Sequence, residues 1–271
     1  MSYDNNQVSL DIQERTPPWA DQLDHNSLLV FVHIPKSGGT SLKGYLQHIY
    51  GRFCMTYHAP FHPNVLENAT KESAKNVLSI ASHFPYGIHR QFGSKDKRHP
   101  LEGDGLFEGR DIRYVSIFRE PVARIVSLYN FVTTFPHHRF HKAVQGMSIE
   151  AFLDFFAEKQ PEIISNCQCF LVSKDRTFEF AKTFVEENYF LVAPLERSVE
   201  FIQILSRKMA WPTDAGKYVI RNESPKAESP DALNDTLRER ILSLNSEDAK
   251  LYRYVEQRFE EILKDHDEKV D

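Results

Sequence analysis

A lysine, two glycines and three hydroxyl side chains stand next to one another near the start of this chain. The segment reads Lys-Ser-Gly-Gly-Thr-Ser over residues 36–41. Adjacent glycines let a backbone approach a phosphate group closely, the lysine supplies a full positive charge, and the hydroxyl groups supply hydrogen-bond donors. If a helix follows, its first N–H groups and its dipole also favour an anion. We therefore predict an anion-binding loop formed by Lys36, Ser37, Gly38, Gly39, Thr40 and Ser41.

The order of these residues separates the loop from the Walker A nucleotide-binding motif. In that motif the lysine follows the glycines, whereas Lys36 precedes Gly38 and Gly39. The order therefore argues against a kinase or an ATPase. A simpler interpretation stays open, in which Thr40 or Ser41 only caps the helix that follows, because Ser and Thr are common helix caps.

Several apolar runs of strand length are each followed by a segment with polar residues that are candidates for ligand binding. Residues 27–34 form a mostly apolar run, and residues 40–49 then show apolar side chains at helical spacing. Similar runs at 76–81 and 112–118 precede further polar segments. Such continuous runs fit strands buried on both faces, as in a parallel sheet. In open sheets of this kind ligands bind beyond the carboxyl ends of the strands, which is where these runs deliver polar residues.

Strands that alternate with helices predict an α/β fold in one domain, with a mainly parallel central sheet flanked by helices. A helix is expected to start at Pro121, since proline is favoured in a first turn. Residues 1–26 are polar and contain Pro17 and Pro18, which predicts a loosely attached arm before a domain that spans 27–271. Further helices are predicted at 148–159, 178–188, 197–210, 231–244 and 246–264, and a further strand at 189–193.

Two segments together resemble the donor-binding motifs of a known family. The nonapeptide at 33–41 closely resembles the 5′-phosphosulfate loop of sulfotransferases that use 3′-phosphoadenosine 5′-phosphosulfate (PAPS), and is most similar to carbohydrate sulfotransferases of the heparan sulfate 2-O and 6-O type. Ser37 stands where that pattern usually has threonine. The segment at 115–129 resembles the 3′-phosphate-binding element, which implies that Arg119 and Ser127 hold the 3′-phosphate.

The resemblance runs from about residue 27 to residue 263 and implies more than a donor site. It implies a single P-loop-type domain, PAPS as the sulfuryl donor, and no required metal. It also implies that Lys36 contacts the 5′-phosphate and the bridging oxygen, where charge grows as the donor leaves. Lys36 is therefore expected to be catalytic as well as donor-binding.

A base is needed to take the proton of the acceptor hydroxyl, and histidine suits this role because its ordinary pKa of about 6.5 leaves it mostly neutral at pH 7. His83 follows the second apolar run, and the segment at 82–87 resembles the family segment that carries the base, with Ser82 in place of the usual glycine. His83 is therefore the predicted base, and a half-buried histidine bonded to backbone is the alternative interpretation. His58 is the rival base, and His33 is expected to pack beneath the loop as a structural residue.

Several basic stretches are candidates for binding the acceptor, which is expected to be a carbohydrate or another hydroxyl-bearing molecule, anionic ones included. Arginine, lysine and histidine in such stretches suit an anionic sugar such as a uronic acid. A charge run is more often an exposed face, so the sequence does not choose among them. The candidates are His89–Arg90, residues 95–99 and residues 137–142, with Arg221 and Asn222 predicted to contact either the nucleotide or the acceptor.

Composition excludes several other classes of protein. With 33 basic and 38 acidic residues the net charge is −5, so nothing predicts non-specific nucleic-acid binding. Three cysteines, Cys54, Cys167 and Cys169, are too few for a disulfide framework and are interpreted as reduced thiols. The chain shows no signal peptide and no apolar run of about 18 residues. A cytoplasmic protein without a membrane span is therefore predicted.

The leading hypothesis is a PAPS-dependent sulfotransferase that moves a sulfuryl group to an acceptor hydroxyl by in-line displacement, with His83 as the base. Two alternatives stay open. One is a nucleotide-dependent kinase on the same architecture, which would use ATP with magnesium. The other is a non-catalytic module that binds PAPS or its product 3′-phosphoadenosine 5′-phosphate (PAP).

Overall fold

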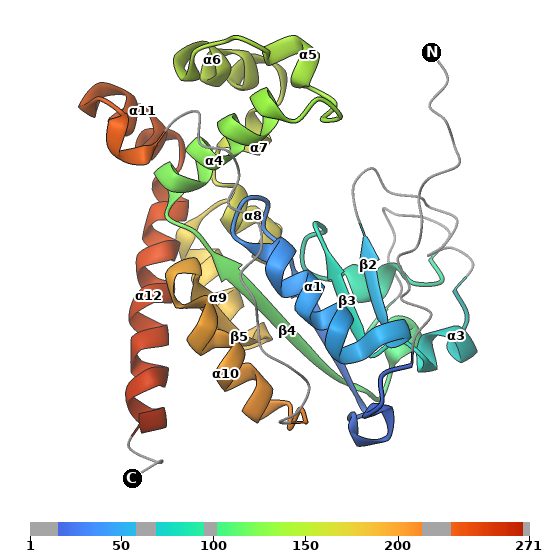
Figure 1. The fold of residues 1–271 in the computed structure, drawn as a ribbon. Coiled ribbons are helices and arrows are strands. Elements are labelled where there is room, and N and C mark those ends of the chain that lie inside the picture. The colour runs from blue at the N-terminus through green and yellow to red at the C-terminus, as the bar shows by residue number, and fades with distance from the viewer. Residues whose placement is uncertain (1–15, 58–68, 95–101, 213–228, 268–271) are drawn as a thin grey trace.

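A parallel sheet of five strands forms the centre of the part of the chain that the computed structural model describes, namely residues 16–57, 69–94, 102–212 and 229–267. The strands are β1 (Ser27–Val32), β2 (Cys54–Tyr57), β3 (Ser79–Ser82), β4 (Asp111–Phe118) and β5 (Tyr189–Pro194). Their order in the sheet is β2-β3-β1-β4-β5 (Figure 1).

The central strand is β1, whose six residues are all buried. It pairs with β3 on one side and with β4 on the other, so that Val32 lies opposite both Ser82 and Ser116. The carboxyl ends of these three strands therefore lie side by side. Because the chain reaches β3 and β4 on opposite sides of β1, this edge of the sheet has the strand reversal at which α/β proteins bind ligands.

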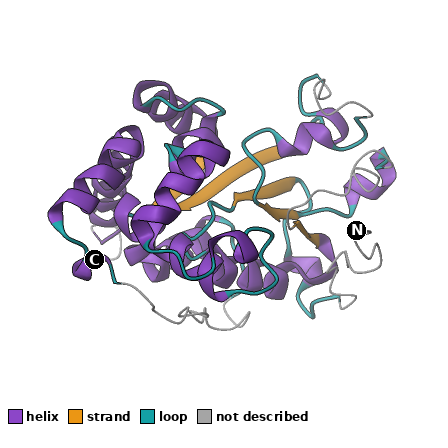
Figure 2. Ribbon diagram, turned by 90° about the horizontal axis from the view of Figure 1, so that it is seen from above, coloured by secondary structure: helices purple, strands orange, loops and turns teal. Residues whose placement is uncertain are grey.

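Helices cover both faces of the sheet (Figure 2). Alternate residues of β1 supply the two faces, since Leu28 and Val30 belong to one hydrophobic cluster and Leu29 and Phe31 to the other. The second cluster is covered by α1 (Gly39–Tyr50) and α10 (Ser198–Lys208). The first is covered by α3 (Lys71–Lys75), α8 (Cys167–Ser173) and α9 (Phe178–Asn188), while α12 (Ser246–Asp267) contributes side chains to both.

A third hydrophobic cluster lies beyond the carboxyl end of β4, where a group of helices gathers (Figure 1). Its centre is α4, which begins at Pro121, as predicted. Phe152, Phe156 and Ile241 from the neighbouring helices are completely buried against it. The helices of this group are α4 (Pro121–Thr134), α5 (His141–Val144), α6 (Ile149–Lys159), α7 (Pro161–Ile164) and α11 (Asp235–Leu244).

The α/β fold with a parallel sheet is confirmed, and the differences are local. The first strand ends at Val32 instead of residue 34, because the chain turns into the loop at His33. The second begins at Ser79 instead of residue 76, because Asn76 ends helix α3. The edge strand β2 was not predicted, since its four residues show neither a long apolar run nor an alternation.

Part of the predicted N-terminal arm packs on the domain. Trp19 and Leu23 are buried in the same cluster as α1. The indole N–H of Trp19 donates to the carbonyl of Ile49 at 2.8 Å. From Trp19 onward, therefore, the chain belongs to the packed domain and is not loosely attached. Within the described ranges, none of the helices has both the length and the apolar character that crossing a membrane requires.

Candidate functional site

The predicted anion loop connects β1 to α1 in a tightly curled conformation. Lys36 and Gly38 both have positive φ angles, 70° and 72°. Curled backbones of this kind gather N–H groups into a concavity that suits an anion. Helix α1 begins at Gly39, its N-cap is Gly38, and no side chain caps it. The interpretation that Thr40 or Ser41 only caps this helix is therefore wrong.

Both glycines are required by what lies against them. A Cβ atom on Gly39 would lie 1.9 Å from Cδ2 and 2.2 Å from Nε2 of His33. A Cβ atom on Gly38 would lie 2.2 Å from Cδ1 of Leu195. His33 is buried and packs directly beneath the loop, as the sequence predicted. The loop therefore packs against the His33 ring and against Leu195, which directly follows β5.

Arg119, directly after β4, is tied to the loop. Its Nη1 donates to the carbonyl oxygen of Lys36 at 2.9 Å. The backbone of Arg119 is held by the buried side chain of Gln168 on α8, which accepts from its N–H at 3.0 Å and donates to its carbonyl at 2.8 Å. The second motif is therefore held against the first by direct hydrogen bonds.

Glu120 does not pair with Arg119, although the two are neighbours. Its carboxylate caps α4 by accepting from the backbone N–H groups of Val122 at 3.0 Å and Ala123 at 2.7 Å. Within the described ranges no ion pair holds either Arg119 or Lys36. The guanidinium of Arg119 therefore stays available to a ligand anion.

The electrostatics of the loop favour a multiply charged anion. Burial, and then the charge of Arg119, lower the pKa of Lys36 to about 8. Burial is also the main cause that lowers the pKa of Arg119. Two partly desolvated cations that repel each other are stabilised when an anion binds between them. The hydroxyl of Ser37 is buried with no hydrogen-bond partner among the described residues, and a phosphate oxygen would satisfy it.

Helix α4 presents two further side chains toward this region. Ser127 is half-buried, and Phe131 follows it one turn later on the same face. Nζ of Lys36 lies 4.0 Å from the centre of the Phe131 ring, which is a cation–π contact. The loop therefore contacts helix α4 through Phe131, in addition to its contact with Arg119.

His83 follows β3 and lies next to the loop. Its Nδ1 is 2.7 Å from the carbonyl oxygen of His33, and the two rings lie against each other with their centres 4.0 Å apart and their planes tilted by 32°. Because a carbonyl only accepts, Nδ1 carries the proton in this contact. His83 is also half-buried, so the contact agrees with the interpretation of a half-buried histidine bonded to backbone as well as with that of a base that takes up a proton at Nε2.

The structure thus brings the predicted donor residues and His83 to one edge of the sheet. The rival base His58, the residues 95–99, and Arg221 with Asn222 lie outside the described residues. Sequence reasoning missed Gln168 and Phe131. Both residues lie within the stretch 27–263 that resembles the family, but neither has a spacing or a neighbouring motif that marks it as a site residue.

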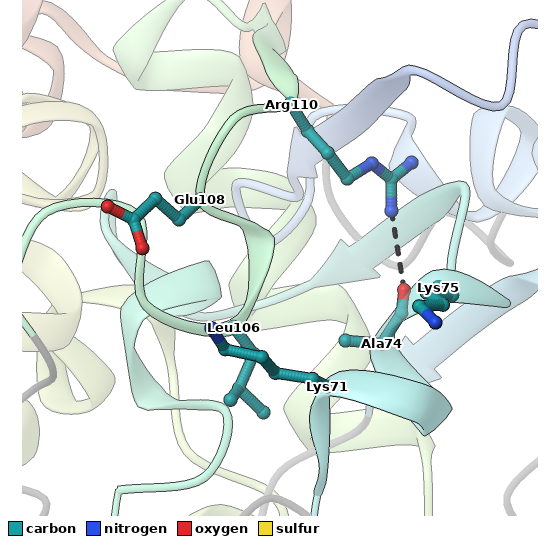
Figure 3. Close-up of a pocket in the computed structure, with 6 residues that line it drawn as sticks. All are labelled: Lys71, Ala74, Lys75, Leu106, Glu108 and Arg110. Atoms are coloured by element: carbon teal, nitrogen blue, oxygen red, sulfur yellow. Dashed lines mark hydrogen bonds between the residues drawn. The ribbon is translucent and has the colours of Figure 1, made fainter.

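Two other features do not form a second site of this kind. A pocket of about 220 Å³ near the amino end of the sheet is lined by Lys71, Ala74, Lys75, Leu106, Glu108 and Arg110 (Figure 3). Its most buried cation, Arg110, is occupied by backbone carbonyls, among them those of Ala74 at 3.3 Å and Val77 at 2.6 Å. Among the described residues, no group of three or more histidine, cysteine or acidic side chains is arranged to hold a metal.

Comparison with known families agrees with this geometry. The family described as "Sulfotransferase family" matches residues 22–255, which is most of the chain. The protein therefore belongs to the sulfotransferase family. A comparison with curated proteins finds no match.

Family membership establishes the class of reaction. The protein is a sulfotransferase enzyme with a P-loop-like fold, and its chemistry is the transfer of a sulfuryl group to an acceptor. This result favours the sulfotransferase hypothesis over the kinase, in agreement with the order of lysine and glycines in the loop.

Proposed function

We propose that the protein transfers the sulfuryl group of PAPS to a hydroxyl group of a carbohydrate acceptor. The observation that carries the proposal is the convergence of the loop, Arg119 and His83 at the adjoining ends of β1, β4 and β3. The curled backbone at Lys36 and Gly38 and the unpartnered hydroxyl of Ser37 support a phosphate-bearing donor.

In the proposed site the loop and the second motif bind opposite ends of the donor. Lys36, Ser37, Gly38, Gly39, Thr40 and Ser41 hold the 5′-phosphosulfate end, and Arg119 with Ser127 holds the 3′-phosphate. Lys36 also stabilises the negative charge that grows on the departing phosphate oxygen. Arg119 touches the carbonyl of Lys36, so binding at one phosphate position stabilises the backbone at the other.

His83 is proposed as the general base. The acceptor oxygen forms its bond to sulfur while the bond between sulfur and the phosphate oxygen breaks, the proton passes to Nε2 of His83, and the electron pair stays on PAP. The Nδ1 contact with the His33 carbonyl supports this role, because it orients the ring and stabilises the imidazolium that forms. The donor supplies a transferable group that needs no divalent metal.

The donor site is tested by calorimetric titration with PAP in EDTA, with ATP plus magnesium as the comparison. We expect tight metal-free binding of PAP. Arg119→Ala should weaken it by about 30-fold or more, because a charge-assisted bidentate contact is lost. Arg253→Ala, an exposed arginine on α12, is the matched control and should bind as the wild type does. A preference for magnesium and ATP would contradict the proposal.

The base is tested by His83→Gln. Turnover with labelled PAPS should fall by about 100-fold or more while PAP affinity stays within a factor of about two. The exposed His48, replaced in the same way, serves as the control. Near-normal turnover in His83→Gln would contradict the assignment and direct attention to His58. A protein that binds PAP but transfers to no acceptor would be a binding module instead.

We also propose that the protein works in the cytoplasm. All three cysteines, Cys54, Cys167 and Cys169, are free and buried. A chain that needs no disulfide is suited to a reducing compartment. Cell fractionation that recovers the protein with lumenal markers would contradict this location.

A further inference from the structure

Two helices from distant parts of the chain, α8 and the long helix α12, cap each other at their first turns (Figure 1). The carboxylate of Asp248 on α12 accepts from the backbone N–H groups of Gln168 at 3.0 Å and Cys169 at 2.8 Å on α8. In return, the side-chain oxygen of Asn166, the residue before α8, accepts from the N–H groups of Glu247 at 3.1 Å and Asp248 at 3.2 Å. Backbone N–H groups in the first turn of a helix have no acceptor within that helix, so each side chain satisfies groups of the other helix.

Asp248 can act only through its neighbours, because its side chain is completely buried. Burial raises the pKa of Asp248, whereas the charge of Arg124 and the two N–H donors lower it. Arg124, on α4, is itself only 1% exposed. A buried carboxylate is costly unless it is hydrogen-bonded and its charge is compensated, so these contacts set its position. A side chain in this position is out of reach of a ligand, and any influence on the reaction has to pass through the residues that it holds.

One of those residues, Gln168, connects Asp248 to the donor site. The amide of Gln168 holds both backbone groups of Arg119, accepting from the N–H at 3.0 Å and donating to the carbonyl at 2.8 Å. Nη1 of Arg119 then donates to the carbonyl of Lys36 at 2.9 Å. A continuous series of hydrogen bonds therefore runs from α12 through the first turn of α8 to the second motif and the anion loop.

The type of contact at each step makes this series suited to fixing a position. Both bonds from Asp248 go to backbone atoms of α8, so they hold the turn itself and not only a side chain. The amide of Gln168 can then serve the N–H and the carbonyl of Arg119 together only from one place, since hydrogen bonds weaken steeply when their geometry is lost. Residues that bind a ligand have to be held to within about 0.5 Å by such supporting contacts.

We propose that Asp248 is a positioning residue of the donor site, which holds the first turn of α8 and through Gln168 places Arg119 where the 3′-phosphate of the donor binds. The inference rests on the proposed function, which assigns Arg119 to that phosphate. The competing interpretation is that Asp248 only stabilises the packing of α8 on α12. The two differ in a measurable way. Positioning changes the affinity for a 3′-phosphate through Gln168, whereas stabilisation changes only the free energy of unfolding.

The test is a double-mutant cycle on the Kd of PAP. Asp248→Asn keeps the shape of the side chain but turns an amide NH2 group toward one of the two N–H donors, so it should raise the Kd of PAP by about 10-fold. In the Gln168→Leu background the same substitution should change that Kd by less than about 2-fold, because the connection to Arg119 is already broken.

A second ligand separates positioning from a general disturbance of the site. Adenosine 5′-phosphate lacks the 3′-phosphate of PAP, so its Kd should change by about 2-fold or less in Asp248→Asn. Val255→Ala is the matched control, since Val255 lies on α12 and is completely buried. It should lower the free energy of unfolding and leave the Kd of both nucleotides unchanged. All titrations are made under conditions in which circular dichroism shows every variant to be folded.

Hydrogen exchange on the wild type gives a measurement that needs no variant, which keeps the inference testable if Asp248→Asn does not fold. Because coupling between two sites is reciprocal, PAP should slow the exchange of the Gln168 and Cys169 amides. The amides of α3 serve as the reference and should exchange at the same rate with and without PAP. Unchanged exchange at Gln168 and Cys169 in a protein saturated with PAP would overturn the inference.

The outcomes separate this inference from the proposed function. Asp248 is not a positioning residue if Asp248→Asn leaves the Kd of PAP within about 2-fold of the wild type, or if it weakens PAP and adenosine 5′-phosphate equally. The same conclusion follows if its effect is equal with Gln168 and with leucine at that position. In each of these cases the donor site stands. If the wild type fails to bind PAP, the proposed function itself is wrong.

Discussion

Replacing Gly39 by alanine tests the link between the loop and His83. The new Cβ atom would lie 1.9 Å from Cδ2 of His33, where carbon atoms normally lie about 3.5 to 4 Å apart. The His33 ring has little space to move, because the Phe31 ring stacks on it with centres 5.4 Å apart, the His83 ring lies 4.0 Å from its centre, and it is only 7% exposed. The substitution therefore has to displace the loop, the His33 ring, or both.

The magnitude follows from two opposing terms. Forcing an extra methyl group into a packed site costs about 1 to 3 kcal/mol, whereas alanine in place of a helical glycine returns up to about 1 kcal/mol. We expect the free energy of unfolding of Gly39→Ala to fall by about 1 to 2 kcal/mol. Because the displaced His33 holds Nδ1 of His83, turnover should also fall by about 100-fold, and PAP affinity by about 10-fold.

The assay is urea unfolding together with PAP titration and turnover. Gly44→Ala is the control, since Gly44 lies on the same helix and its Cβ would meet nothing within 4 Å. That variant should be more stable by about 0.5 to 1 kcal/mol and fully active. If Gly39→Ala unfolds at the wild-type urea concentration and keeps its PAP affinity, the packing of His33 beneath the loop does not position the site.

Three further predictions concern the pH dependence and the second motif. Since Lys36 has a pKa of about 8 and must be charged to hold an anion, PAP affinity should be nearly constant below about pH 7, about 2-fold weaker at pH 8 and about 10-fold weaker at pH 9. Lys36→Arg should bind PAP equally at pH 7 and pH 9, and an equal fall in both proteins would contradict the reasoning. Gln168→Leu should lower the free energy of unfolding by about 1 to 3 kcal/mol and weaken PAP binding, because the backbone N–H and carbonyl of Arg119 both lose their partner. The exposed Gln203→Leu is the control and should change neither quantity. An unchanged PAP affinity in Gln168→Leu would show that Gln168 stabilises the fold without positioning Arg119 for the donor. Burial lowers the pKa of His89 to about 4, below its value of about 6.5 in an unfolded chain. The stability that neutral His89 contributes is therefore complete above pH 6.5, and up to about 3 kcal/mol of it is lost as the pH falls to 4. Denaturant unfolding of His89→Gln should lack this loss, and the same acid dependence in the variant and the wild type would contradict the reasoning.

The class of fold was predictable because its signals are local. Ser27–Val32, Asp111–Phe118 and Tyr189–Pro194 are apolar runs that stand out without reference to the rest of the chain, and Phe178–Asn188 coincides with the predicted helix. The short edge strand Cys54–Tyr57 carries no such signal. It is a strand because it pairs with β3, and that pairing is a tertiary property.

The donor loop was predictable for a related reason. Its chemistry belongs to consecutive residues. The glycines were predicted to admit an anion, and the structure shows in addition that a Cβ atom on Gly38 would meet Leu195 and one on Gly39 would meet His33. The contributions of Gln168 and Phe131 were not predictable from spacing. Gln168 reaches Arg119 across 49 positions of the chain, and Phe131 is an ordinary apolar residue of α4 until Lys36 is folded against it.

Most of the elements and the identity of the reactive groups can be derived from the sequence, because hydrophobic periodicity and loop chemistry depend on neighbouring residues. Which groups meet depends on the tertiary structure. The parallel pairing of β1 with β3 and β4 brings His83 and Arg119 to Lys36. The same folding buries His89 and leaves Phe135 and Arg139 exposed. Burial and proximity depend on the packing of distant segments, so they change the pKa of Lys36 and select among basic stretches that look alike in the sequence.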